Sequence, residues 1–352
     1  MKIKKLVVSF FMGFIFYHLM FVLLFPVSDD FEKIKITEYG DIKSYIFIEE
    51  RKTLSRGFDE LKISRQTENT FSVDMMDRKR VYMKNPENLD QYKLVQESMV
   101  KYTVPKKVAI LYMATGRYIK FWDNFYSSME KYFLPRHEKT YFLFTDHDDL
   151  QVPNNVVKIH QDQLPWPYVT LKRFHFFSQV SEELSKFDYI YFLNGTMMPL
   201  REINEEIFPT EEQAIMVTLH PGYFRSRQSH RPYDRNRKSK AYIPSNEGEY
   251  YAMGGFNGGT GKGFLKVIKT LKEWTDIDLK NNTMPVWHDE SLLNRYLLTY
   301  MKENGKPLVL LPEYAIPETG HSMVDELRPY AKMFILDKGK YGGHGWLRSS
   351  DK

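Results

Sequence analysis

The fold is decided by the stretch Asp188–Met198, which reads Asp-Tyr-Ile-Tyr-Phe-Leu-Asn-Gly-Thr-Met-Met. Its first part, Tyr189–Leu193, predicts a buried strand because short runs of aromatic and β-branched residues favour strands. Asn194-Gly195-Thr196 follows at once and predicts a turn at the carboxyl end of that strand. Ligands of open α/β sheets bind at such ends. The turn by itself is equally typical of an Asx or ST turn without a ligand.

Strand-like and helix-like segments alternate on both sides of this stretch. Val108–Met113 predicts a strand, and a small-residue loop and a helix ending near Pro135 follow it. Such alternation predicts one α/β domain with a mainly parallel sheet over residues 106–348. Further strands are expected at Tyr141–Thr145, Val156–His160, Ala214–Leu219 and Leu308–Leu311, and helices at Thr170–Leu184, at Gly263–Trp274 and from Trp287 to about Tyr300.

Composition limits the possible classes of protein. The chain has 352 residues, of which 42% are hydrophobic, so it can bury a sizeable core. A net charge of +5 is modest for this length and does not indicate a nucleic-acid partner. The absence of cysteine excludes disulfides, thiolate zinc sites and cysteine nucleophiles.

The N-terminal region predicts a membrane anchor and a stem. Residues 1–5 carry three lysines, and residues 6–27 contain no charged side chain. This run is long enough to cross a bilayer as a helix, with residues 1–5 as a cytoplasmic tail. A cleaved signal peptide is the alternative, but Phe25–Ser28 is a poor cleavage site. We therefore expect a type II signal anchor at 6–27, and a mostly polar, irregular stem at 28–105.

Four segments contain residue types that suit chemistry, and each also has a structural interpretation. Asp289 and Glu290 would point about 100° apart on a helix, so they are not expected to act as a paired acid–base couple. They are also suited to capping a helix N-terminus, and His288 is expected to be structural. The basic loop Arg225–Lys240 suits either a solvated loop or a mobile phosphate clamp, and the tail, with Lys338, Lys340 and Arg348, could act in the same way. The glycines of Tyr250–Gly259 allow close approach of a ligand, or form a turn.

Four motifs occur in chain order: His-Pro-Gly-Tyr at 220–223, Ala-Tyr-Ile-Pro at 241–244, Tyr-Tyr-Ala-Met-Gly-Gly-Phe-Asn-Gly-Gly at 250–259 and Trp-His-Asp-Glu-Ser-Leu-Leu-Asn-Arg-Tyr at 287–296. Together they resemble glycosyltransferase family 6, the histo-blood-group A/B and α-1,3-galactosyltransferase group. Leu-Pro-Glu-Tyr also stands at 311–314, where that family has Ser-Pro-Glu-Tyr. Segments 171–175 and 341–344 look more like the bacterial branch.

The resemblance implies a GT-A fold, in which a Rossmann-like mixed sheet is flanked by helices. It implies retaining transfer of galactose or N-acetylgalactosamine from a UDP donor to a hydroxyl of a glycan acceptor on a glycolipid or glycoprotein. Glu290 matches the catalytic carboxylate, which acts as nucleophile or stabilises an oxocarbenium ion. His220 and Trp287 are expected to bind the acceptor. The residues expected to bind the donor are Ala114, Thr115, Tyr118, Arg173, Asn194, Thr196, Met253, Gly254, Gly255, Asp289, Lys340 and Arg348.

One departure from the family pattern bears on the metal. Most eukaryotic members carry Asp-x-Asp, which binds Mn²⁺, where this chain has Asn194-Gly195-Thr196. Amide and hydroxyl oxygens are weak ligands for a hard dication. We therefore expect no metal cofactor, with Mn²⁺ as the alternative. Arg173, with Lys340 or Arg348, would then neutralise the diphosphate.

The donor sugar depends on Met253-Gly254-Gly255. By resemblance, Gly255 leaves room for an acetamido group, whereas Met253 matches the galactose-specific blood-group enzyme. The steric argument favours N-acetylgalactosamine. A catalytically inactive UDP- or sugar-binding membrane protein of the same fold is the alternative function. The expected location is the Golgi membrane for a eukaryotic protein and the inner membrane for a bacterial one.

Overall fold

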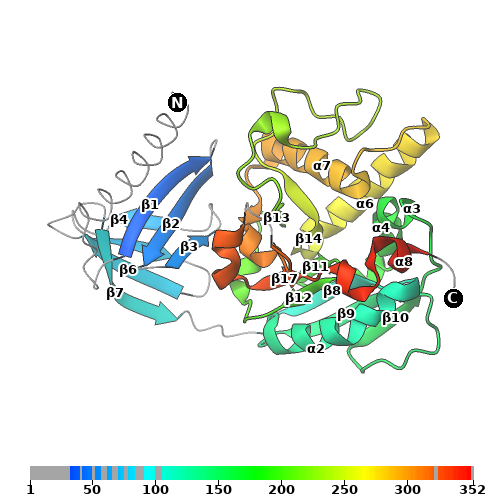
Figure 1. Cartoon of the computed structure of the whole chain (residues 1–352), viewed down its shortest axis with the longest axis horizontal. Helices are drawn as coiled ribbons and strands as arrows, with labels where there is room; N and C mark the ends of the chain where they lie inside the picture. Colours follow the sequence, from blue (N-terminus) through cyan, green and yellow to red (C-terminus); the bar gives the residue numbers. More distant parts are fainter. Residues whose placement is uncertain are drawn as a thin grey trace, which may run out of the picture.

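The central element of the catalytic domain is a seven-stranded mixed sheet (Figure 1). The computed structural model describes residues 105–320 and 324–349, together with the backbone of seven strands between residues 32 and 99. The strand order of the central sheet is β10-β9-β8-β11-β14-β13-β15. The strands are β8 (Lys107–Met113), β9 (Glu138–Thr145), β10 (Val156–His160), β11 (Tyr189–Leu193), β13 (Ile215–Leu219), β14 (Ala252–Thr260) and β15 (Leu308–Leu310).

Strand direction places several chain segments at one edge of this sheet. β10, β9, β8 and β11 are parallel to one another, and β13 is parallel to β15. β14 alone is antiparallel to both of its neighbours. The carboxyl ends of β8, β11 and β13 therefore meet the amino end of β14. The expected mixed sheet is confirmed, and its ligand-binding edge is assembled from these four ends.

Both faces of the sheet are covered, as the residues of β8 show. Ala109 and Leu111 belong to a core formed with α4 (Arg173–Ser178), α6 (Gly261–Lys280) and α7 (His288–Asn304). Val108, Ile110 and Tyr112 belong to the opposite core, formed with α2 (Trp122–Tyr132). Because alternate residues of a strand face opposite sides, continuous burial of β8 requires both layers.

The helix predicted at 170–184 is divided into three short helices. These are α3 (Tyr168–Leu171), α4 and α5 (Ser181–Leu184). The remaining helical segments are α8 (Gly343–Arg348) and the 3₁₀ helices η1 (Gly116–Phe121), η2 (Glu205–Ile207), η3 (Gln228–His230), η4 (Pro312–Tyr314), η5 (Asp325–Tyr330) and η6 (Lys338–Tyr341).

A small three-stranded sheet joins the C-terminal tail to the turn after β11. It contains β12 (Met197–Pro199), β17 (Met333–Ile335) and β16 (Ile316–Pro317), in the order β12-β17-β16. Met197 pairs with Ile335, and the Leu336 N–H donates to the Thr196 carbonyl at 2.8 Å. The tail after Leu336 is therefore fixed beside the ligand-binding edge.

The region expected to be an irregular stem contains seven strands in one antiparallel sheet, drawn beside the catalytic domain in Figure 1. Its order is β3-β2-β1-β7-β6-β5-β4. No helix in the described part of the chain is long and apolar enough to span a membrane, and the predicted anchor at 6–27 lies outside that part. The strands are β1 (Glu32–Tyr39), β2 (Ile42–Glu49), β3 (Lys52–Arg56), β4 (Lys62–Arg65), β5 (Thr70–Asp74), β6 (Arg78–Lys84) and β7 (Gln91–Met99).

Candidate active site

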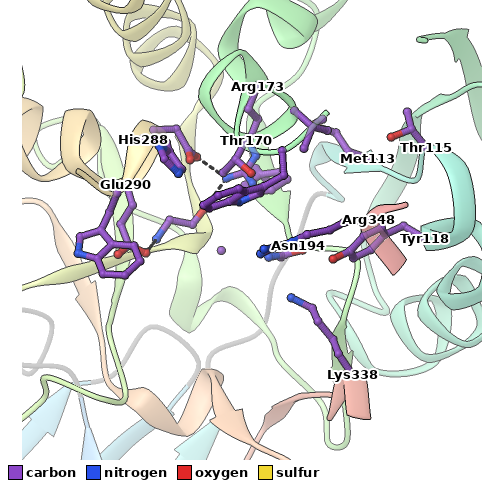
Figure 2. Close-up of a pocket in the computed structure, with 18 residues that line it drawn as sticks. Met113, Thr115, Tyr118, Thr170, Arg173, Asn194, His288, Glu290, Lys338 and Arg348 are labelled. Carbon is purple, nitrogen blue, oxygen red and sulfur yellow. Dashed lines mark hydrogen bonds and ion pairs between the residues drawn. The ribbon is translucent and has the colours of Figure 1, made fainter. Parts of the chain in front are cut away.

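A cavity of about 280 Å³ opens at the ligand-binding edge of the central sheet (Figure 2). Its wall is formed by the ends of β8 and β11, the start of β14, the first turn of α7 and the C-terminal tail. Of the residues expected from the sequence, the lining contains Thr115, Tyr118, Arg173, Asn194, Gly254, Gly255, Trp287, Asp289, Glu290 and Arg348.

Arg173 and Asp289 form a buried ion pair in the cavity wall. The Arg173 guanidinium also donates to the Gly254 carbonyl at 3.3 Å and lies 4.3 Å from the centre of the Phe192 ring. Burial raises the pKa of Asp289 to about 7, although the charge of Arg173 opposes this shift. Buried ion pairs need further hydrogen bonds to hold their geometry. Here the pair joins α4, α7 and the start of β14.

Glu290 is held by two hydrogen bonds, one to each carboxylate oxygen. The Tyr251 hydroxyl donates to Oε1 at 2.8 Å, and the Gly254 N–H donates to Oε2 at 2.7 Å. Burial raises the pKa of Glu290, and these two donors and Arg173 partly offset that effect. Asn294 supports the turn by donating to the Glu290 carbonyl at 2.9 Å. The carboxylate is therefore fixed in orientation before any ligand binds.

The two adjacent carboxylates have separate partners, as their angular separation predicted. Neither acid is the N-cap of α7, which is Trp287, but both lie in the first turn, where the helix dipole favours negative charge. Asp289 pairs with Arg173, whereas Glu290 accepts from Tyr251 and Gly254. Their bonds join the helix to its neighbours, and Glu290 faces the cavity (Figure 2).

Three cationic side chains line the cavity, and Figure 2 shows Lys338 and Arg348 on the side away from Glu290. Arg348 stacks over the Trp166 ring at 4.7 Å, and its charge acts on the hydroxyl of Tyr118. Burial and the charges of Arg348 and Arg173 lower the pKa of Lys338 to about 8. Grouping cations in this way is unfavourable without an anion. The arrangement therefore suits a ligand with several negative oxygens.

The tail lysine at the cavity is Lys338, not the expected Lys340. Lys340 forms an ion pair with Glu318 and is absent from the cavity lining. Both lysines lie in the 3₁₀ helix η6, where side chains two residues apart point about 120° apart. Their different orientations follow from that geometry and from the pairing of β17 that precedes it.

The turn after β11 presents one polar side chain to the cavity, that of Asn194. Thr196 is fully buried, and its hydroxyl has no hydrogen-bond partner. Across residues 105–320 and 324–349, no three His, Asp or Glu side chains are grouped to hold a metal. Asp289 and Glu290 are already bonded to protein groups. These donors do not fit a hard dication, which prefers several carboxylate oxygens.

Three other expected residues lie around the cavity rather than on it. Ala114 is buried, and its carbonyl accepts from the Thr145 hydroxyl at 2.8 Å. Met253 is also buried, and its methyl group would lie 2.7 Å from a Cβ added to Gly255. His220 follows β13, with its ring centre 4.9 Å from that of Tyr223 and 5.8 Å from that of Tyr251.

The basic loop Arg225–Lys240 contributes no residue to the cavity. Arg231 donates to the carbonyls of Gly248 and Ser226, at 3.0 and 3.2 Å. Arg235 donates to the carbonyl of Ile243 at 2.6 Å. Two of the arginines therefore hold the loop in place, and the mobile phosphate clamp stays a prediction.

Seven residues of the cavity were not identified from the sequence as site residues. His288, expected to be structural, packs its ring 5.3 Å from that of Trp166, and burial lowers its pKa. The position of Trp166 on a loop was an available signal, since binding residues are often on loops. The seven residues are Met113, Trp166, Val169, Thr170, Phe192, Gly195 and His288.

Comparison with known proteins adds independent evidence. Residues 91–331 match the family model for glycosyltransferase family 6. The chain is 32% identical over 243 residues to O-antigen biosynthesis glycosyltransferase WbnI of Escherichia coli, covering 68% of this chain and 99% of that protein. It is 32% identical to histo-blood group ABO system transferase 1 of Rattus norvegicus, and the match covers 70% of this chain and 65% of that protein. It is 30% identical to globoside alpha-1,3-N-acetylgalactosaminyltransferase 1 of Gallus gallus, and the match covers 59% of this chain and 61% of that protein.

Proposed function

This chain is a member of glycosyltransferase family 6, and from that premise we propose that it transfers N-acetylgalactosamine, or galactose, from a UDP donor to a glycan hydroxyl with retention of the α configuration. The mixed sheet and its flanking helices fit a GT-A-like fold. The observation that carries the proposal is the position of Glu290, which is fixed by Tyr251 and Gly254 in a cavity that also contains three cations.

These groups suit the two charges that develop when a glycosyl–phosphate bond breaks. The bond between the anomeric carbon and the UDP oxygen lengthens, and negative charge accumulates on the leaving diphosphate. Arg173, Lys338 and Arg348 would stabilise that charge. Glu290 would stabilise positive charge at the anomeric carbon or form a bond to it. The acceptor oxygen would then bond to the anomeric carbon, and the hydroxyl proton would pass to the departing diphosphate.

The residues around Gly255 support N-acetylgalactosamine as the donor sugar. Gly254 and Gly255 line the cavity, while Met253 packs behind them, beside Gly255. A side chain at Gly255 would both reduce the cavity and displace the Met253 methyl group. The chicken relative carries N-acetylgalactosaminyltransferase in its name, which supports the same donor and an α-1,3 linkage.

Transfer without a metal is supported by the donor set of the site. Asn194 and the buried Thr196 replace a carboxylate pair, and the cations supply positive charge instead. We also propose that residues 6–27 anchor the chain as a single-pass membrane protein, with the catalytic domain on the non-cytoplasmic side. Detection of peptides from residues 6–27 in the mature membrane-bound protein tests the anchor.

One screen tests the function. Purified protein is given UDP-GalNAc or UDP-Gal, with and without EDTA, and UDP release and sugar transfer are measured. We expect faster turnover of UDP-GalNAc than of UDP-Gal, and we expect EDTA to leave the rate of transfer unchanged. A strict Mn²⁺ requirement would contradict metal-free transfer. UDP binding without hydrolysis or transfer of either donor would instead support the inactive binding protein.

A further inference from the structure

The link between α6 and α7 exposes large apolar side chains to solvent. Met284, Val286 and Trp287 are 38%, 54% and 48% exposed. Single exposed apolar residues are ordinary, but a group of them on one loop marks an interaction site. Trp287 also lines the cavity, so the group lies at the cavity opening.

Cations of the basic loop lie next to this group. The Val286 N–H donates to Asp234 Oδ2 at 3.0 Å, which joins the apolar link to the loop. At the end of α6, Asp278 accepts from the Ser239 hydroxyl and the Lys240 N–H, each at 2.7 Å. In Figure 1 the loop (yellow-green) runs above α7, and Tyr233 and Ile243 pack with Leu298 of that helix.

Two carboxylates of this region face inward, whereas the exposed Asp276 of α6 pairs with His175 and Lys272. Asp234 and Asp278 are buried and accept hydrogen bonds from the loops that they join. Arg237, Lys238 and Lys240 are exposed. The outer surface at this point therefore combines positive charge with apolar and aromatic side chains.

We propose that this basic–apolar surface, formed by Met284, Val286, Trp287, Arg237, Lys238 and Lys240, binds an anionic lipid bilayer. Aromatic and aliphatic side chains enter the interfacial layer of a membrane, while Lys and Arg contact anionic head groups. A soluble acidic partner would account for the cations but not for the exposure of Val286 and Trp287. Because Trp287 also lines the cavity, this contact places the cavity opening at the lipid surface. The binding does not depend on which sugar is transferred.

Tryptophan fluorescence tests the contact even in the full chain. All five tryptophans lie in the catalytic domain, at positions 122, 166, 274, 287 and 346, so residues 1–105 contribute no signal. The full chain is reconstituted in brominated phosphatidylcholine vesicles with and without phosphatidylglycerol. We expect quenching that increases with phosphatidylglycerol, falls at high salt, and is largely lost in Trp287→Phe.

Charge variants make the test specific. In the combined variant Arg237→Gln, Lys238→Gln and Lys240→Gln, the equilibrium constant for contact of the catalytic domain with the anionic bilayer, read from the quenching, should fall by about fivefold for each cation removed. The matched control is Lys262→Gln, Lys266→Gln and Lys269→Gln, which removes three exposed cations of α6 and should retain quenching. Val286→Ser should weaken quenching in anionic vesicles without changing turnover of a soluble acceptor.

Three outcomes would overturn the proposal. Equal quenching in neutral and anionic vesicles would show that the anchor alone brings the domain to the bilayer. Equal loss of tryptophan quenching in the two charge variants would show a non-specific dependence on net charge. Protection of Lys238 and Lys240 from acetylation in detergent without lipid would indicate that another segment of the chain covers the surface.

Discussion

The two sides of the cavity are built differently. On one side, Glu290 and Asp289 are bonded to groups of the central sheet and its helices, through Tyr251, Gly254 and Arg173. On the other side, Lys338 and Arg348 come from a tail that is held by the small sheet β12-β17-β16. The first side is rigid before a ligand binds, whereas the second groups like charges that an anion would stabilise. Substitutions should therefore affect the chemical step on one side and donor binding on the other.

The largest effect is expected for Glu290→Gln. This substitution keeps the size of the side chain and removes the negative charge that faces the anomeric carbon. We expect kcat to fall by about 10³-fold with little change in donor KM. Steady-state kinetics with UDP-GalNAc measure both values. Unchanged kcat would move the catalytic role away from Glu290 and would remove the difference between the two sides.

A smaller effect, on kcat/KM for the donor, is expected for Lys338→Met. Loss of one charge-assisted hydrogen bond to a diphosphate should lower kcat/KM for the donor by about 30-fold. Lys340→Met is the matched control, because that lysine lies in the same 3₁₀ helix and pairs with Glu318 at the surface. The control should change kcat/KM by less than about twofold. Equal effects of the two substitutions would contradict the assignment of Lys338 to the donor site.

The comparison also shows which parts of the site could be read from the sequence. Trp287–Glu290 was placed by its resemblance to a family motif, and it lies at the N-terminus of a helix as expected. Met253–Gly255 was expected in a turn or in a segment that a ligand approaches closely, but it lies in the unpredicted strand β14. The choice between Lys338 and Lys340 depends on the orientation of η6, which is set by the long-range pairing of Met197 with Ile335. No local pattern carries that information.

The same limit applies to larger elements. Five of the six expected strands of the central sheet were found because they are apolar and largely buried on both faces, whereas the edge strand β10 is mostly exposed or half-buried. The seven N-terminal strands were missed because their segments mix charged and apolar residues without sustained alternation. The sequence predicted one helix over 170–184 because its apolar residues recur with a helical period, and that period indicates only which face is buried. The breaks at Lys172 and Val180 depend on local backbone geometry, which the period does not show.

Tyr251→Phe tests the rigid side more gently. The substitution removes the hydroxyl that donates to Glu290 Oε1 and leaves the buried ring in place. We expect kcat to fall by about fivefold, the cost of one hydrogen bond. Because that donor lowers the pKa of Glu290, its loss should move the acidic limb of the kcat profile to higher pH. A fall in kcat without this shift would indicate a packing effect only.

The smallest effect is a change with pH on the tail side. The pKa of Lys338 is lowered to about 8 in the ligand-free protein, so its ammonium is lost as the pH rises through that value. The kcat/KM for the donor should therefore fall by a few-fold above about pH 8, since the neutral amine no longer pairs with the diphosphate. Bound diphosphate would raise the pKa of Lys338. The fall at alkaline pH should therefore occur at a higher pH in the profile of kcat than in the profile of kcat/KM. Lys338→Arg should remove this fall, because a guanidinium stays charged throughout this range. If the alkaline fall in kcat/KM persists in Lys338→Arg, another group causes it, and the tail cations then stay charged throughout this pH range.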